Sequence, residues 1–177
     1  MSWILIQHGH LIAPEDRGIQ DLLIINGRIV AIGRNLPQLR DPYSTETYDA
    51  RDKMMLPGLI DPHLHIIGAS GLKGPATRTT DLEISRITKV GVTTVISPLG
   101  ADSLSRTIPN LLARAMQLET EGITAYCYTG GWKKPIPTLT GDPQADVTYL
   151  DRILGIKVAI SEPNAPYLSF EDLSLLA

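Results

Sequence analysis

The chain has 177 residues, of which 43% are hydrophobic and 20% are charged, and its formal net charge is −3 at pH 7. This balance is typical of a globular protein, excludes a disordered or fibrous chain, and offers no basic surface for nucleic acid. The longest apolar runs have about four or five residues, whereas a membrane helix needs roughly 20. With one cysteine, Cys127, and no leader-like start, the sequence predicts a cytoplasmic protein with neither a membrane nor a nucleic-acid partner.

The first 55 residues consist of short β-rich runs separated by turns. Between two of these runs lies Asn26-Gly27, the dipeptide that a two-residue type I′ hairpin prefers. We therefore expect residues 1–55 to form a small β unit. Its predicted strands cover 3–7, 18–25, 28–32 and 45–49.

From residue 56 to residue 177, short apolar runs alternate with helical patterns. The runs begin about 31 to 36 residues apart, which is the rhythm of βα units in a parallel sheet, either an open doubly wound sheet or a barrel. This region is therefore expected to be a separate α/β domain. The predicted strands cover 56–61, 92–97, 123–129 and 154–161, and the predicted helices cover 81–89 (capped by Thr79 or Thr80), 109–121, 144–152 and 169–177.

A histidine pair follows the first of these strands. His63 and His65 are two residues apart, so on an extended backbone both side chains point the same way and can bind one metal ion through ring nitrogens. Imidazole suits zinc, iron, nickel or manganese. The alternative is a pair of half-buried polar side chains, but the position at the carboxyl end of a strand favours a site. His8 and His10 have the same spacing without that context, and we expect them to be structural.

Lys157 lies in the middle of an apolar strand, where burial of an ammonium group is costly and lowers its pKa. Three interpretations stay open. The lysine reaches solvent or pairs with an acid, it is a Schiff-base nucleophile, or its neutral amine reacts with carbon dioxide to form a carbamate that bridges two metal ions.

A nucleotide-binding doubly wound fold is the alternative to a barrel. The glycine-rich segment 68–74 follows a strand, yet it fits neither the dinucleotide-binding nor the P-loop spacing. Within it, Lys73 either meets an anionic substrate group or is solvated. Trp132 precedes a proline-rich loop. It is either a lid residue or an aromatic side chain that packs against this loop.

The segment 57–65, Pro-Gly-Leu-Ile-Asp-Pro-His-Leu-His, resembles the first metal-binding motif of the amidohydrolase superfamily, and Lys157 lies where that superfamily carries a carbamylated lysine. Within the superfamily, the sequence most resembles the isoaspartyl dipeptidase (β-aspartyl peptidase) family. The resemblance extends from about Trp3 to Ala177 and includes segments 11–19, 74–79, 99–106 and 155–161.

This resemblance implies a (β/α)8 TIM barrel with a small β-sandwich. Residues 1–55 would form part of the sandwich, and residues 56–177 would form about the first four βα units of the barrel. It also implies two zinc ions, with His63 and His65 on the more buried ion and carbamylated Lys157 bridging both. The implied reaction is hydrolysis of a small amide or dipeptide by a hydroxide shared between the metals.

Four positions depart from the family pattern. Leu72 stands where the family has a glutamate for the substrate's amino group, and Trp132 stands where a tyrosine supports the carbonyl oxygen. Asn164 replaces an arginine that grips a substrate carboxylate, and Ala101 replaces a threonine. Sites built from charged hydrogen bonds discriminate strongly, so these changes predict either a different substrate or lost activity.

The resemblance also implies ligands that this sequence lacks, namely two histidines and an aspartate from later strands. Residues 56–177 are too few for a barrel of roughly 250 residues. Two hypotheses follow. Either the chain is the amino-terminal portion of an amidohydrolase that works with a carboxyl-terminal half or as a homo-oligomer, or it is a degenerate half-barrel that serves binding or assembly.

Overall fold

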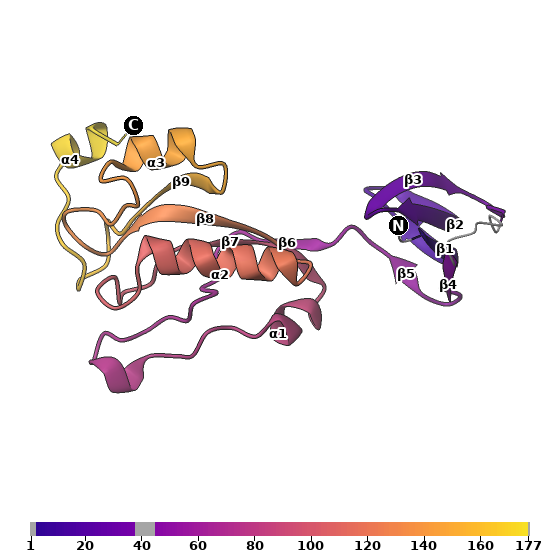
Figure 1. The fold of residues 1–177 in the computed structure, drawn as a ribbon, viewed down its shortest axis with the longest axis horizontal. Coiled ribbons are helices and arrows are strands. Elements are labelled where there is room, and N and C mark those ends of the chain that lie inside the picture. The colour runs from indigo at the N-terminus through magenta and orange to yellow at the C-terminus, as the bar shows by residue number, and fades with distance from the viewer. Residues whose placement is uncertain (1–2, 38–44, 177) are drawn as a thin grey trace. The chain divides into compact units, whose positions relative to one another are not determined.

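The computed structural model describes residues 3–37 and 45–176. The chain divides into two compact units, Met1–Pro57 and Gly58–Ala177, which are treated separately below (Figure 1). In the described part of the chain, no helix is both long and apolar enough to cross a membrane.

Unit 1 is a five-stranded mixed sheet with the order β3-β2-β1-β4, in which β5 also pairs with β1. The predicted hairpin is confirmed, because Asn26 (φ 50°) and Gly27 (φ 76°) both take the positive φ values of a type I′ turn between β2 and β3. The described residues form one sheet, so the sandwich stays a prediction. The strands are β1 (Trp3–Ile12), β2 (Asp16–Ile25), β3 (Arg28–Gly33), β4 (Thr45–Asp49) and β5 (Met54–Met55).

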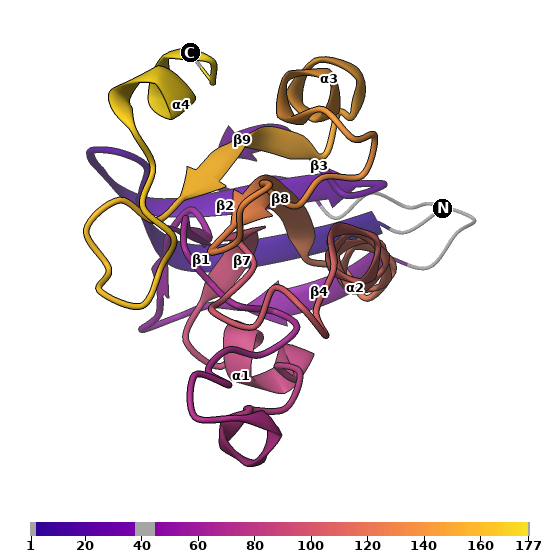
Figure 2. The ribbon, with the colours of Figure 1, turned by 90° about the vertical axis from the view of Figure 1, so that its left-hand side faces the viewer.

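Unit 2 is a four-stranded parallel sheet with the order β6-β7-β8-β9, and a helix follows each strand. Figure 2 shows α1, α2 and α3 arrayed along one side of this curved sheet. The predicted alternation of strands and helices is therefore present. The elements are β6 (Leu59–Asp61), η1 (Pro75–Thr77), α1 (Ile84–Thr88), β7 (Val92–Ser97), α2 (Ile108–Thr120), β8 (Thr124–Gly131), α3 (Pro143–Tyr149), β9 (Ile153–Val158) and α4 (Phe170–Ser174).

The core of unit 2 lies between α2 and the sheet. The helix is capped by the Thr107 side chain, which accepts a hydrogen bond from the Asn110 N–H, and its apolar residues recur with the helical period. Fourteen buried residues form the core. Cys127 is among them, and burial raises its pKa to about 12, so this thiol is not a nucleophile. The α2 residues in the core are Ile108, Leu111, Ala115 and Leu118.

Helix α1 is shorter than predicted, and its N-cap is Glu83 instead of Thr79 or Thr80. The reason is that Thr79 is committed to the preceding loop. Its N–H donates to the Ala69 carbonyl (3.1 Å), and its hydroxyl accepts from the Ala69 N–H (2.7 Å). Residues 69–79 thus form a closed loop whose neck is the Ala69–Thr79 pair.

Candidate metal centre

The histidine pair lies just beyond β6, at the carboxyl edge of the parallel sheet. The strand ends at Asp61, whose carboxylate accepts a hydrogen bond from the His63 N–H (3.0 Å), and the Leu64 N–H donates to the Ile96 carbonyl of β7 (3.1 Å). These bonds fix the turn that carries the pair. The two rings lie edge to face, with centroids 5.3 Å apart.

One nitrogen of His65 is held by the backbone. Its Nδ1 lies 3.1 Å from the Pro98 carbonyl oxygen, which can only accept, so Nδ1 carries the proton and Nε2 keeps its lone pair. Burial lowers the pKa of His65; the Pro98 hydrogen bond opposes this, and the charges of His63, Lys157 and Arg106 add to the lowering. His65 is thus favoured as a neutral imidazole with a free nitrogen, the form that binds a metal.

Lys157 faces the side of the sheet opposite to α3. Ile156 and Val158 line a groove with Val147 of α3, so the residue between them points the other way. A register shift between Cys127 and Tyr128 against β9 sets this alternation. Within the described residues the Lys157 side chain forms no hydrogen bond or ion pair, and its charge contributes to the lowered pKa of His65.

Lys157 is half-buried, not fully buried as its apolar strand led us to expect, so the interpretation in which its amine reaches solvent stays open beside the other two. The strand beside it is adapted to a close approach. Gly130 pairs with Lys157, and a Cβ atom on Gly130 would lie 2.2 Å from the Lys157 carbonyl oxygen. Gly130 also has a φ of +91°, which disfavours any side chain.

These residues fit the beginning of a coordination set. They comprise two imidazoles, one of them with a fixed tautomer, and a lysine amine without an acidic partner in the described part of the chain. No group of three or more His, Cys, Asp or Glu side chains suited to a metal occurs within residues 3–37 and 45–176. A catalytic zinc site usually takes three protein ligands and a water molecule.

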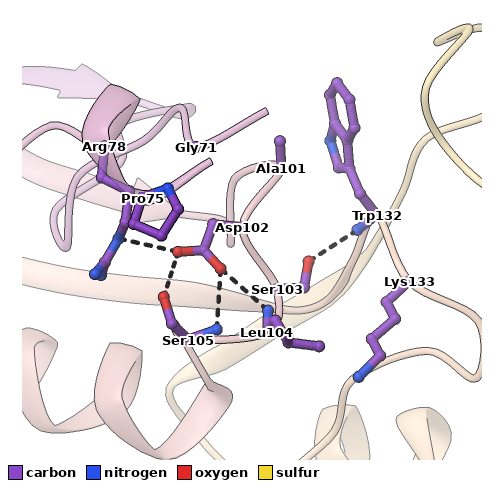
Figure 3. Close-up of a pocket in the computed structure, with 10 residues that line it drawn as sticks. All are labelled: Gly71, Pro75, Arg78, Ala101, Asp102, Ser103, Leu104, Ser105, Trp132 and Lys133. Carbon is purple, nitrogen blue, oxygen red and sulfur yellow. Dashed lines mark hydrogen bonds and ion pairs between the residues drawn. The ribbon is translucent and has the colours of Figure 1, made fainter. Parts of the chain in front are cut away.

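A cavity of about 440 Å³ opens at the carboxyl ends of β7 and β8, and its lining does not include His63, His65 or Lys157 (Figure 3). A Cβ atom on Gly100 would lie 3.7 Å from Cε1 of His65, which places the histidine against the loop that lines the cavity. Ala101 and Trp132 line it, whereas Leu72 and Asn164 are exposed and do not. The lining residues are Gly71, Pro75, Arg78, Ala101, Asp102, Ser103, Leu104, Ser105, Trp132 and Lys133.

Asp102 organises one wall of this cavity, and sequence reasoning missed it. Its carboxylate accepts hydrogen bonds from the Ser105 hydroxyl, from the Ser105 N–H (2.9 Å) and from the Leu104 N–H (3.3 Å). It also pairs with Arg78 (3.0 Å) and lies 3.8 Å from Arg106. The Ser105 hydroxyl is the main cause that holds the pKa of Asp102 below its ordinary value. The local signal was the Asp-x-x-Ser spacing, which is typical of a turn capped by a side chain.

Two further buried polar residues were missed. Arg106 is 3% exposed and donates to the Ala69 carbonyl (3.2 Å) and the Thr79 carbonyl (2.5 Å), which pins the neck of loop 69–79. Asp146 of α3 is fully buried, and its partners lie on β8 and on the loop after it. Neither residue could be found from sequence, because the partners of Arg106 are carbonyls 27 and 37 residues away, and those of Asp146 are backbone amides and hydroxyls that follow no residue-type pattern.

Trp132 is fixed by its backbone, since its N–H donates to the Ser103 hydroxyl (3.3 Å). In Figure 3 its indole and the Ala101 side chain project to the same side of the cavity. Lys73 makes no side-chain hydrogen bond or ion pair within the described residues and is exposed, as a solvated lysine would be.

No protein-family model matches the chain. Among solved structures, β-aspartyl dipeptidase from Fervidobacterium islandicum AW-1 in complex with β-Asp-Leu dipeptide is 35% identical with a TM-score of 0.91, over 98% of this chain and 45% of that one. D-hydantoinase from Geobacillus stearothermophilus is 38% identical over 94 residues, 52% of this chain and 18% of the hydantoinase. Dihydroorotase from Geobacter metallireducens is 39% identical over 66 residues, 36% of this chain and 15% of the dihydroorotase.

The chain spans less than half the length of each of these relatives, which fits an amino-terminal portion. The relatives are metal-dependent amidohydrolases with a TIM barrel, and the curved parallel sheet of unit 2 corresponds to part of such a barrel. The similarity over 98% of the chain agrees with the resemblance that the His63 and His65 motif indicated. The chain belongs to the amidohydrolase superfamily.

Proposed function

We propose that the chain is a portion of a zinc-dependent enzyme that hydrolyses an amide or peptide bond, and that His63, His65 and Lys157 are its metal ligands. The observation that supports this most is His65, whose Nδ1 is bonded to the Pro98 carbonyl while its Nε2 has no partner among the described residues, with the ring of His63 5.3 Å away. A backbone partner on the second ring nitrogen is typical of histidines that bind metals.

Lys157 is the proposed bridging ligand between two zinc ions. Its amine, when neutral, adds to carbon dioxide and releases a proton, which converts a cation into a carbamate with two oxygen donors. A lysine on the inner face, near a histidine and without an acidic partner in the described residues, suits this conversion. When bound, zinc supplies Lewis acidity that polarises an amide carbonyl and lowers the pKa of water.

The proposed substrate is a small amide or dipeptide, as in the relative solved with β-Asp-Leu dipeptide. Ala101 and Trp132, in place of the threonine and tyrosine that the family carries, line the cavity whose loop lies against His65. We therefore propose a specificity that differs from that of isoaspartyl dipeptidase. A cytoplasmic setting, and completion of the site by a carboxyl-terminal half or by a homo-oligomer, stay predictions.

The alternative is a degenerate half-barrel used for binding or assembly. It is favoured by the same substitutions and by exposed apolar residues on the two edge strands of the sheet, such as Ile60 (65%) and Leu154 (47%). The histidines and Lys157 argue against it, because a module without a metal has no need of them.

Zinc uptake tests the proposal without requiring turnover. The chain is equilibrated with zinc in the presence and absence of ¹³C-bicarbonate, then measured by mass spectrometry for metal and by ¹³C NMR for a carbamate. We expect bound zinc and a carbamate signal that Lys157→Met abolishes. Absence of zinc from the chain under both conditions would contradict the proposal. This outcome does not depend on whether the chain hydrolyses amides.

A further inference from the structure

The cavity at the carboxyl ends of β7 and β8 contains an arginine whose guanidinium is only partly hydrogen-bonded. Arg78 donates through Nε to Asp102 (3.0 Å), and in the described residues its two terminal nitrogens form no hydrogen bond or ion pair. Its side chain is 38% exposed, and it lines the cavity. Figure 3 shows the Nε end directed at Asp102, with the terminal nitrogens beyond that contact.

The backbone of Arg78 is held at both ends of the loop that carries it. Its N–H donates to the Pro75 carbonyl (3.2 Å), and residues 70 and 78 form an antiparallel bridge. Below them Arg106 pins the neck of the same loop through the Thr79 carbonyl. Arg78 is thus preorganised at its backbone and at Nε, while the fork of its guanidinium remains available.

The ion pair with Asp102 leaves part of the Arg78 guanidinium available for another anion. The Asp102 carboxylate is already satisfied by the Ser105 hydroxyl and by two backbone N–H groups, with buried Arg106 at 3.8 Å. Among the residues that line the cavity, Arg78 and Lys133 are cationic and Asp102 is anionic, which leaves a formal charge of +1. Such a wall attracts an anion.

We propose that Arg78 binds the carboxylate of the ligand that occupies this cavity, and that Asp102 is the positioning residue that fixes its guanidinium. A planar fork binds a carboxylate through two parallel hydrogen bonds, which a lysine cannot reproduce. Trp132 and Leu104 supply the apolar part of the cavity, so the ligand class is an amide that carries both a carboxylate and an apolar group. This proposal assigns a specificity-determining residue, Arg78, to the proposed amidohydrolase site and in that sense rests on it.

The test compares two probes that differ only in charge, N-acetyl-L-phenylalanine and N-acetyl-L-phenylalaninamide. Binding is measured on chelator-treated protein by calorimetry and by the fluorescence of Trp132, in a Trp3→Phe background that leaves Trp132 as the single tryptophan. We expect the carboxylate to bind about tenfold more tightly than the amide, as a charge-assisted bidentate bond implies.

Arg78→Gln is expected to abolish this preference and Arg78→Lys to reduce it, because a point charge replaces the fork. Arg86→Gln, at an exposed arginine of α1, is the matched control and should keep the full preference. Equal affinity for the two probes, binding of neither, or an undiminished preference in Arg78→Gln would overturn the proposal. If Arg78→Gln does not fold, Arg78→Lys must still lose most of the preference.

The measurement distinguishes this proposal from the proposed function. Probe binding is measured on metal-free protein, and zinc uptake is measured in the separate experiment described above. A preference for the carboxylate probe in a chain that takes up no zinc would therefore refute the metal site alone. Normal zinc uptake without a carboxylate preference would refute the role of Arg78 alone.

Discussion

Two histidine pairs with identical spacing occur in the two units of this molecule, and they have different surroundings. In unit 1, His8 lies within an irregularity of β1 between Ile6 and Gly9, His10 follows it, and each ring contacts a different carboxylate. His8 contacts Asp49 (3.4 Å) and His10 contacts Asp16 (2.6 Å). In unit 2, the rings of His63 and His65 lie together, and a backbone carbonyl holds one of them.

The backbone explains this difference. His8 has a φ of 63°, in the left-handed region that β-strands exclude, so the alternation that would align two side chains is broken there. Its N–H donates to Asp21 (2.8 Å), which fixes the bulge. His-x-His spacing is therefore informative only together with the backbone on which it lies, and the carboxyl edge of a parallel sheet provides the suitable one.

The largest expected effect of removing either histidine pair is the loss of zinc binding when His63 and His65 are replaced. The double variant His63→Ala/His65→Ala should lose at least about 100-fold in zinc affinity, since even loss of an outer-shell partner costs up to that much. His8→Ala/His10→Ala is the matched control and should bind zinc as the parent does. Metal titration of both variants checks this, and equal losses in the two would remove the contrast between the pairs.

The next effect concerns the strand that presents Lys157. Gly130→Ala is expected to destabilise the fold by about 3 kcal/mol, because the new Cβ would combine a positive φ with a clash against the Lys157 carbonyl. Denaturant unfolding measures the change. The control is Gly141→Ala, where φ is +95° and no atom lies within 4 Å of a Cβ, so only about 1 kcal/mol of backbone strain is expected. Equal costs at the two sites would exclude the clash.

A smaller effect is expected at Asp146, which joins α3 to the loop after β8. Its carboxylate accepts from the Thr129 hydroxyl (2.5 Å), the Leu139 N–H (2.8 Å), and the N–H and hydroxyl of Thr140 (2.9 and 2.7 Å). Asp146→Asn should cost about 2 kcal/mol, because an amide nitrogen would face donors in a buried site. Asp142→Asn is the control, since asparagine caps a helix as well as aspartate does.

The same residue predicts a pH dependence. Burial raises the pKa of Asp146, but the hydrogen bonds from Thr129, Leu139 and Thr140 outweigh it, so the folded-state value lies below the ordinary one. Its stabilisation is therefore present above the ordinary aspartate pKa of about 3.9 and is lost as the pH falls through the lower folded-state value. Urea unfolding of parent and Asp146→Asn should differ at neutral pH and converge in acid. A difference that persists unchanged in acid would contradict this assignment.

Local patterns were sufficient for much of the fold. Strand β7 covers 92–97 as predicted, and α2 begins and ends within one residue of its prediction, because Thr107 caps it and its apolar period is regular. Strand β6 was predicted from 56 but begins at Leu59. Apolar composition indicates burial potential, whereas a strand exists only where a neighbour pairs with it, and pairing with β7 starts at Leu59.

The candidate site was predictable only in part, for the same reason. The spacing of His63 and His65 is local, and so is the unusual position of Lys157 in an apolar strand. The face of the sheet that Lys157 takes depends on a register shift against β8, which no local pattern reveals. The partners of Arg78 and Arg106 lie up to 37 residues away, so their roles required the folded chain.

The smallest expected effect is at the surface pair Lys134–Asp172, which ties the loop after β8 to α4. The Lys134 ammonium donates to both carboxylate oxygens (2.7 and 2.6 Å) and, with the Ser169 cap, lowers the pKa of Asp172 to about 2. Lys134→Gln should raise that pKa towards its ordinary value without a measurable change in global stability, since exposed ion pairs contribute little. NMR titration of Asp172 checks this, with Lys133→Gln as the adjacent control. Because salt screens an exposed pair, the difference between parent and Lys134→Gln should shrink at about 1 M salt, and a salt-independent difference would mean that hydrogen-bond geometry, not charge, sets the shift.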